Sequence, residues 1–120
     1  MTTSGQKKLF QAYKKVKVAN VASDGVLVQQ SESPLYHMNI IGPMRTAMAS
    51  AGFDDVQTLF FPQPVYPSGW WTATMAGKHD LLTAFREEAS ANKPFDTHYY
   101  NAAMHLAAMT APEFFLSELE

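Results

Sequence analysis

Two short apolar runs that flank a proline-rich turn restrict the fold of this chain more than any other feature. The first run, DVQTLFF, covers residues 55–61, and the second, WWTATMA, covers residues 70–76. Both are rich in residues that favour strands, and the second alternates between apolar and polar positions. The stretch between them, PQPVYPSG, holds three prolines and a Ser-Gly turn. We therefore expect an antiparallel pair of strands whose connection is longer than a tight hairpin.

A third strand is predicted before this pair. VLVQQ at residues 26–30 follows an SDG turn and is a short β-branched apolar run, which is typical of a buried strand. Pro34 ends the strand because proline cannot donate a hydrogen bond to a sheet ladder. The run contains neither charge nor proline, so an unpaired outer edge at this strand would favour self-association.

Helical periodicity covers most of the remaining chain. Apolar residues recur at helical spacing through residues 35–51, and Gly52 is placed to cap the C-terminus of that helix. Because proline inside a helix costs about 3 kcal/mol, we expect the main helix to begin at Pro43. Residues 92–100 are predicted to form a loop. The other predicted helices are HDLLTAFREEASA at 79–91 with Leu81, Leu82 and Phe85 on one side, NAAMHLAAM at 101–109, PEFFLSELE at 112–120, and KKLFQAYKKVKVANVA at 7–22 with its lysines facing water.

Composition excludes several classes of protein and of site. The formal net charge is -2, which argues against a protein that coats nucleic-acid phosphates. The chain has no cysteine, so disulfides, thiolate metal sites and a cysteine nucleophile are excluded. No apolar run approaches the roughly 20 residues needed to span a bilayer, and the first residues lack the apolar core of a secretion signal. We therefore expect a cytoplasmic protein with no membrane partner.

Four motifs, in order, resemble those of the polyamine aminopropyltransferases, the spermidine synthase family. YPSGWW at residues 66–71 resembles the loop that lines the amine pocket of those enzymes, and DGVLVQQSESPLYH at 24–37 resembles the strand and turn that carry a pocket glutamine. MRTAMASAGF at 44–53 resembles the helix that follows, and THYYNAAMHLAAMTAPEFF at 97–115 resembles the C-terminal region. The resemblance extends from about residue 24 to the end of the chain.

The resemblance implies an α/β fold, the C-terminal part of a Rossmann-like sheet of the methyltransferase type. About three strands, including an antiparallel pair, would be flanked by helices, and residues 1–120 would form a single partial domain. In the family, the preceding half carries a glycine-rich loop, an acidic residue for the ribose and an Asp-rich loop, and none of these motifs occurs in this sequence. We therefore expect no catalytic residue in this chain.

The activity implied by the resemblance is transfer of an aminopropyl group from decarboxylated S-adenosylmethionine, a co-substrate, to putrescine or a similar diamine. No cofactor and no metal are implied. Tyr66, Gln30 and Trp71 match polyamine-binding positions of the family, and Pro67 and Gly69 belong to the loop that supports them. Tyr66 would line the methylenes of the amine, Trp71 would attract a cation through its ring face, and Gln30 would hydrogen-bond an amine.

Structural interpretations stand beside these roles. A tyrosine or tryptophan next to a turn is often a packing residue, and Gln30 alone would be a surface glutamine. Trp70 should point to the sheet face opposite Trp71, so we assign it to packing. Glu32 could orient an amine, but a turn carboxylate that faces water is the simpler interpretation. His37 is expected to satisfy backbone groups at the helix entry, and Tyr99, Tyr100 and Asn101 are expected to provide aromatic packing and an N-cap.

Three functions remain open from the sequence. The chain supplies the amine pocket of a spermidine synthase and acts with a complementing N-terminal half or as a homo-oligomer. Alternatively, it is a polyamine-binding or regulatory subunit without activity of its own. The third alternative is a degraded gene product with no function.

Overall fold

The structure, a computed structural model, describes residues 4, 5, 7, 8, 11, 12, 25–79, 82 and 84–119. Within these ranges the helix predicted at residues 7–22 is represented by a few exposed residues with helical backbone, and the rest of that prediction lies outside the described residues. The elements are β1 (Leu27–Gln30), α2 (Met38–Ser50), β2 (Asp55–Pro62), β3 (Trp70–Gly77), α3 (Glu87–Ala91), α4 (Ala102–Ala108) and α5 (Glu113–Glu118).

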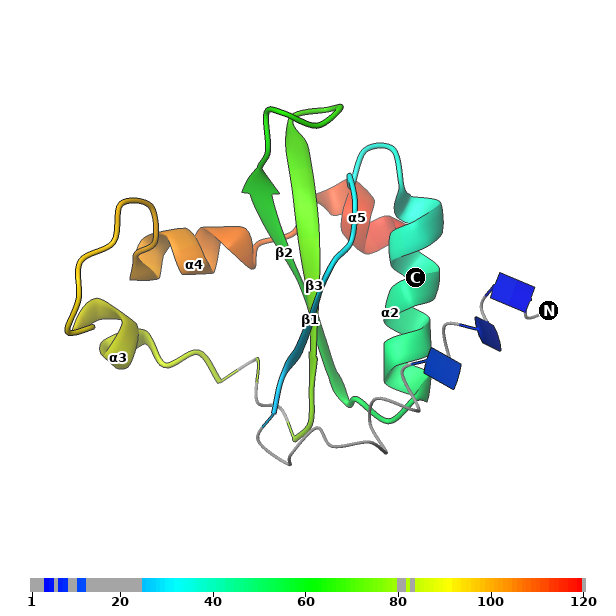
Figure 1. Ribbon diagram of the computed structural model, residues 1–120, viewed down its shortest axis with the longest axis horizontal. Helices are drawn as coiled ribbons and strands as arrows, with labels where there is room; N and C mark the ends of the chain where they lie inside the picture. The colour runs from blue at the N-terminus through cyan, green and yellow to red at the C-terminus, as the bar shows by residue number, and fades with distance from the viewer. Residues whose placement is uncertain are drawn as a thin grey trace.

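The three strands form one antiparallel sheet in the order β1-β3-β2 (Figure 1). β3 pairs with β2 from Asp55 opposite Gly77 to Pro62 opposite Trp70, which confirms the predicted antiparallel pair. β1 pairs with the other side of β3, with Gln30 opposite Ala73. β3 is therefore the central strand, although it comes last in the sequence.

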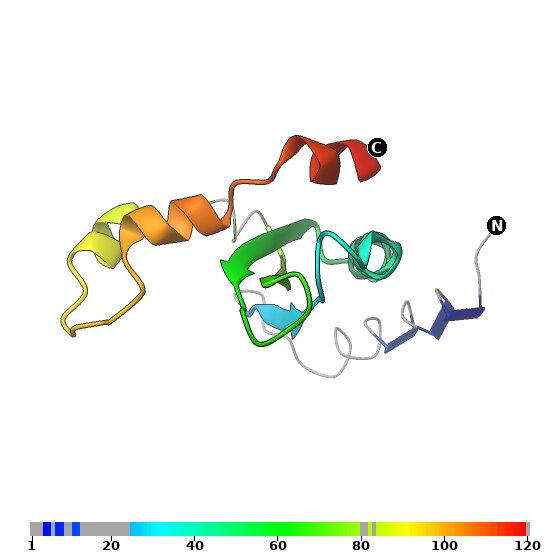
Figure 2. The same ribbon diagram turned by 90° about the horizontal axis from the view of Figure 1, so that it is seen from above.

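The two faces of this sheet differ in burial. Side chains alternate along β3, and Thr72, Thr74 and Ala76 are fully buried on one face. Ala73 and Met75, on the other face, are only half-buried. Figure 2 shows why: α2 and α5 lie on one side of the molecule, while α4 and α3 extend away on the other.

The core lies between the sheet and the helices α2 and α5. One buried cluster joins α2 to the sheet through Met44, Ala47, Met48, Ala51, Phe53 and Ala76. A second joins Ile41 of α2 and Phe60 of β2 to Phe115 of α5. Phe60 and Phe115 meet edge to face with ring centroids 4.9 Å apart, a favoured aromatic geometry.

A chain of buried hydroxyl groups crosses the same layer. Ser31 Oγ lies 2.8 Å from both Thr72 Oγ1 and Thr74 Oγ1, and Thr74 Oγ1 lies 3.1 Å from Thr58 Oγ1. Arg45 closes the chain by donating from Nη1 to Thr58 Oγ1 at 2.7 Å, and burial lowers the pKa of Arg45. Each hydroxyl thus has a partner, as buried polar groups require.

The predicted start of the main helix is wrong: α2 begins at Met38, and Pro43 lies inside it. Proline there lacks the N–H that would donate to the carbonyl of Asn39, but Asn39 is exposed, so water can solvate that carbonyl. Gly42 also has no Cβ to clash with the proline ring. The added turn buries Ile41 completely against Phe60 and Phe115, which offsets the cost.

The end of α2 is as predicted. Gly52 has φ 105°, a left-handed conformation that glycine adopts without strain. Its N–H donates to the carbonyl of Ala49 at 3.1 Å, and the N–H of Phe53 donates to the carbonyl of Met48 at 3.2 Å. This pair of bonds is a Schellman motif, and Phe53 and Met48 also pack together in the core.

The helix predicted at residues 79–91 is wrong in its first part, because α3 covers only Glu87–Ala91. The N–H of His79 donates to Asp54 Oδ1 and that of Leu82 to Asp55 Oδ2, both at 2.7 Å. These carboxylates hold the backbone at His79 and Leu82, neither of which is helical, and His79 has φ 61°. Leu82 and Phe85 are therefore not on a helix, and Leu81 lies outside the described residues.

The loop, the two helices and the N-cap predicted in the C-terminal part are confirmed, whereas Tyr99, predicted to pack, is 56% exposed. Residues 92–100 form a loop, and α4 begins at an N-cap where Asn101 Oδ1 accepts from the N–H of Met104 at 2.8 Å. Pro112 is the N-cap of α5. No helix in the described part of the chain is long and apolar enough to cross a membrane.

Candidate functional site

The loop between β2 and β3 is a compact, hydrogen-bonded turn. The N–H of Gln63 donates to the carbonyl of Gly69 at 2.8 Å, and the N–H of Gly69 donates to the carbonyl of Tyr66 at 3.0 Å. Ser68 and Gly69 have φ 75° and 67°, so two consecutive residues are left-handed. Pro67 precedes them with a fixed φ. This rigid backbone restricts the direction in which the Tyr66 side chain points from the loop.

The same loop is tied to the segment that follows β1. Ser68 Oγ lies 2.8 Å from Ser33 Oγ, which is completely buried. Ser33 Oγ also accepts from the N–H of Leu35 at 3.2 Å, and Ser68 Oγ donates to the carbonyl of Trp70 at 3.0 Å. Two loops far apart in sequence therefore form one surface at the end of the sheet (Figure 1).

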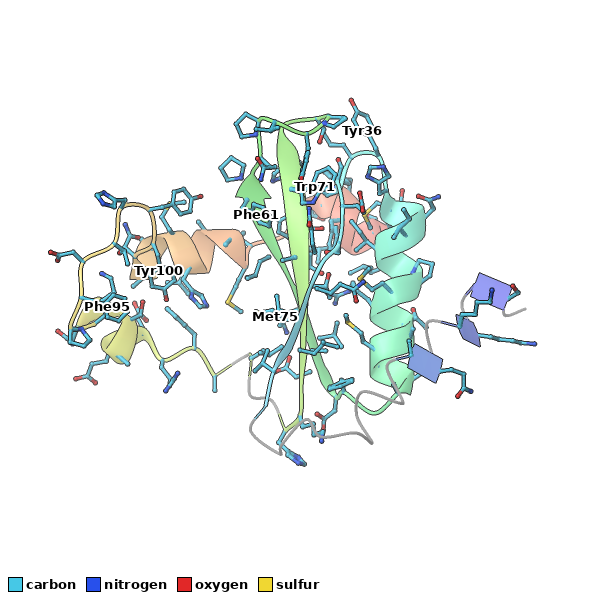
Figure 3. All side chains as sticks on the ribbon, viewed as in Figure 1. Tyr36, Phe61, Trp71, Met75, Phe95 and Tyr100 are labelled. Atoms are coloured by element: carbon cyan, nitrogen blue, oxygen red, sulfur yellow. The ribbon has the colours of Figure 1, made fainter. Side chains whose placement is uncertain are left out.

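Tyr66 and Trp71 are in contact on this surface. Their ring centroids lie 4.7 Å apart with the planes tilted by 48°. Trp71 is 5% exposed and Tyr66 is 41% exposed, so Tyr66 covers Trp71 and still faces solvent. His37 approaches Trp71 edge to face with a centroid distance of 6.0 Å. Figure 3 shows Trp71 at this end of β3.

Trp71 is buried but its indole N–H is not satisfied. Nε1 has no hydrogen-bond partner in the described part of the chain, although buried donors nearly always have one. Trp70 differs, because it packs on the opposite sheet face against Phe60 and Phe114, with centroid distances of 5.6 and 6.0 Å. The packing assignment of Trp70 is confirmed.

Gln30 is the last residue of β1 and is exposed. It lies opposite Ala73 in the register, so it shares a sheet face with Trp71, two residues along β3. Such diagonal neighbours are about 7–8 Å apart, within reach of a long side chain or of one small ligand. The structure thus brings Tyr66 and Trp71 into contact and places Gln30 on the same face. Their binding of a polyamine stays a prediction.

Glu32 joins this group through an irregularity in the strand. The N–H of Ser31 donates to the carbonyl of Thr72, and the N–H of Thr72 donates to the carbonyl of Glu32, both at 2.9 Å. Ser31 and Glu32 therefore both lie opposite the single residue Thr72, as in a β-bulge, and Glu32 has φ 75°. A non-glycine residue held in this conformation is strained, and such residues concentrate at ligand sites.

The carboxylate of Glu32 accepts no hydrogen bond within the described part of the chain. Its Oε2 lies 3.9 Å from His37 Nδ1, which is too long for a hydrogen bond. His37 Nδ1 instead accepts from the N–H of Ser33 at 3.1 Å, so it has no proton to offer Glu32. This bond also confirms that His37 satisfies a backbone group at the helix entry. The Glu32 side chain is 43% exposed.

This arrangement suits a slender organic cation. An aromatic face attracts a cation by about 0.5–2 kcal/mol, and an adjacent carboxylate adds direct attraction. The amide of Gln30 and the hydroxyl of Tyr66 can accept hydrogen bonds from an ammonium group. Among the described residues, no group of three or more histidine or acidic side chains could hold a metal ion.

The chain matches a known protein family. Residues 3–88 match the family described as the spermine/spermidine synthase domain. The chain is 59% identical over 93 residues to a polyamine aminopropyltransferase of Methylococcus capsulatus, covering 78% of this chain and 32% of that protein. It is 57% identical over 96 residues to the polyamine aminopropyltransferase of Thioalkalivibrio sulfidiphilus, covering 79% and 34%. The chain therefore spans about a third of the length of these relatives.

Solved structures agree with this match. A spermidine synthase bound to the transition-state analogue AdoDATO superposes with a TM-score of 0.81 and 26% identity, covering 92% of this chain and 37% of that one. The spermidine synthase of Thermotoga maritima gives a TM-score of 0.80 and 26% identity, covering 92% and 39%. The predicted fold class, the C-terminal part of a Rossmann-like sheet, is confirmed.

Proposed function

The chain belongs to the spermine/spermidine synthase family, and from that premise we propose that it supplies the amine-binding part of a polyamine aminopropyltransferase. The observation that carries the proposal is the contact of Tyr66 with buried Trp71. His37 packs edge to face against Trp71, and the carboxylate of Glu32 lies 3.9 Å from His37 Nδ1. These groups would hold a diamine such as putrescine, with Gln30 as a further hydrogen-bonding partner.

The proposed reaction transfers an aminopropyl group from decarboxylated S-adenosylmethionine. A neutral amine nitrogen attacks the aminopropyl carbon bonded to the sulfonium, a C–N bond forms, and the C–S bond breaks with its electrons left on a thioether sulfur. An alkylamine has a pKa near that of lysine, about 10.4, so the attacking nitrogen must first give its proton to a base. The polypeptide that carries the donor site would supply that base. The second amine of the substrate can stay charged, and this end suits Glu32.

In this proposal the residues of the chain act by positioning. Glu32 holds the charged end, the Tyr66 ring lies along the methylenes with buried Trp71 packed behind it, and the turn fixes Tyr66. Holding two reactants in line lowers the barrier by supplying orientation in advance. Because the chain spans about a third of its relatives, turnover would need a polypeptide that supplies the donor site, from a complementing chain or from a homo-oligomer.

Calorimetry with putrescine tests the amine site directly. The wild-type chain should bind putrescine at one site, Tyr66→Ala should weaken binding at least tenfold, and Glu32→Gln should weaken it similarly because the charge is lost. Tyr99→Ala is the matched control, since Tyr99 is 56% exposed in the distant loop before α4. Equal heats for wild type and Tyr66→Ala, or no heat for either, would contradict the proposal.

A second candidate, a polyamine-binding subunit without activity, is favoured by the fact that all four proposed side chains belong to this one chain. Putrescine binding without thioether formation, when decarboxylated S-adenosylmethionine and the N-terminal part of a relative are both supplied, would favour that subunit. Thioether formation in the same mixture would favour the enzyme.

A further inference from the structure

A second group of polar and aromatic side chains lies in the arm formed by α3, α4 and the loop between them. The arm extends from the sheet on the side opposite α2 (Figures 1 and 2). A hollow of about 420 Å³ lies in it, which is within the range of small-molecule sites. Its lining contains Phe85, Arg86, Ala89, Ser90, Lys93, Pro94, Phe95, Tyr100 and His105. None of these residues belongs to the Tyr66–Trp71 surface.

A hydrogen-bonded chain of three side chains forms one wall of this hollow. Ser90 Oγ lies 2.9 Å from the hydroxyl of Tyr100, which lies 2.9 Å from His105 Nδ1. Phe85 stacks on the imidazole of His105 at 4.0 Å and 25°. Whichever way the hydrogen bonds between Ser90, Tyr100 and His105 run, one of the two end residues keeps a donor that is not used. That donor is His105 Nε2–H if Tyr100 donates to Nδ1, and Ser90 Oγ–H if Nδ1 donates to Tyr100.

The positively and negatively charged side chains of the arm lie in different places relative to the hollow. Arg86 and Lys93 both line the hollow, whereas Glu87 and Glu88, which lie between them in sequence, do not. Within the described residues neither cation has a carboxylate partner. Two unpaired cations and at least one outward donor therefore face the same space, which makes it favourable for an anion and unfavourable for an amine.

The apolar part of the lining is also unusual, because much of it faces solvent. Phe95 is 63% exposed and Tyr100 is 38% exposed. Figure 3 shows both in the loop region of the arm, beside α3 and α4. Exposed aromatic rings next to unpaired cations provide a stacking surface for a planar ring that carries negative charge.

We propose that this hollow binds a small aromatic anion, a planar ring bearing a phosphate or carboxylate group. Arg86 and Lys93 bind the anionic group, helped by the free donor of the Ser90–Tyr100–His105 chain. The ring of the ligand packs against Phe95. The site is separate from the amine site and does not depend on the proposed transferase function.

Titration by two-dimensional NMR or calorimetry tests the site with four probes: phenyl phosphate, benzoate, inorganic phosphate and neutral benzyl alcohol. We expect saturable binding of phenyl phosphate or benzoate at the arm, with benzyl alcohol at least tenfold weaker. Tighter binding of phenyl phosphate identifies a phosphate ester as the natural ligand class, and tighter binding of benzoate identifies a carboxylate. Benzyl alcohol binding as tightly as both anions would overturn the proposal.

Matched variants separate charge from stacking. Arg86→Gln combined with Lys93→Gln should weaken binding of both aromatic anions at least tenfold. Glu87→Gln combined with Glu88→Gln, in α3 between the two cations, should not weaken it. Phe95→Ala should weaken phenyl phosphate and leave inorganic phosphate unchanged. Four of these side chains are exposed and that of Lys93 is half-buried, so circular dichroism should show an intact fold. Unchanged affinity in the Arg86, Lys93 double variant would refute the site.

Discussion

The Tyr66–Trp71 surface and the α3–α4 arm are built in opposite ways. Trp71, at the first site, is buried on a central strand that pairs on both sides. In the arm, neither α3 nor α4 has a buried residue, and local hydrogen bonds determine the geometry. A side chain that makes many buried contacts loses much stabilising energy when it is substituted, whereas a side chain that makes a few exposed contacts loses little. Substitutions should therefore have large effects near the sheet and small effects in the arm.

The largest difference in the free energy of unfolding is expected between substitutions of two phenylalanines. Phe53→Ala removes a ring that is completely buried in the core against α2 and should lower the free energy of unfolding by about 3–5 kcal/mol. Phe95→Ala removes a ring of the arm that is 63% exposed and should change it by less than about 0.5 kcal/mol. Urea unfolding followed by circular dichroism measures both. Similar effects for the two variants would contradict the comparison.

The buried hydroxyl chain should give an intermediate effect. Thr74→Val keeps the shape of the side chain but leaves the hydroxyls of Ser31 and Thr58 without one partner each. We expect a loss of about 1–3 kcal/mol of stability. Exposed Thr110→Val, on the C-terminal side of the arm, removes one hydroxyl bond to the carbonyl of Leu106 and is the control. A loss in the control equal to that of Thr74→Val would show that burial is not the cause.

A smaller effect is expected at the turn that presents Tyr66. Gly69 has φ 67°, and no heavy atom lies within 4 Å of a Cβ added there, so any cost comes from the backbone alone. Gly69→Ala should cost about 1–2 kcal/mol and weaken putrescine binding. Gly69→Asn should cost less, because asparagine adopts the left-handed conformation more readily. Equal calorimetric affinities for all three forms would show that the turn does not position Tyr66.

The smallest effect concerns pH in the arm. Burial lowers the pKa of His105, so the folded chain takes up this proton less readily than the unfolded chain, whose histidine pKa is about 6.5. The stabilising contribution is therefore present above about pH 6.5 and is lost as pH falls through the folded pKa. Arg86, which lines the same hollow, would be repelled by the imidazolium. NMR titration of the histidine, with His105→Gln as control, should show a pKa below that of a free histidine.

The extent to which the sequence predicts the structure differs between elements. The apolar runs at residues 55–61 and 70–76, the cap at Gly52 and the N-cap at Asn101 depend on local patterns, and all were recovered. The start of α2 was missed because its first turn is stabilised by burial of Ile41 against two residues distant in sequence. The start of α3 was missed because Asp54 and Asp55 bind the backbone of residues 79 and 82.

In the candidate site, too, some features follow from local sequence motifs and others depend on distant residues. Tyr66, Trp71 and Gln30 were named from motifs, and the sheet register places them on one surface. Glu32 was weighed as a solvent-facing turn residue, because no sequence pattern indicates a non-glycine residue with positive φ. Its proposed role depends on the bulge opposite Thr72 and on the fact that His37 Nδ1 accepts from Ser33, and both involve hydrogen bonds that the sequence does not specify.

The sequence by itself determined the strands, most helices and the family, because these depend on the periodicity of apolar residues and on short motifs. The tertiary structure alone decided where two helices begin, that the last strand lies at the centre of the sheet, and that Glu32 lies with positive φ in a bulge opposite Thr72. The physical reason is that these features depend on burial and hydrogen bonds between distant residues, whose energies outweigh local preferences.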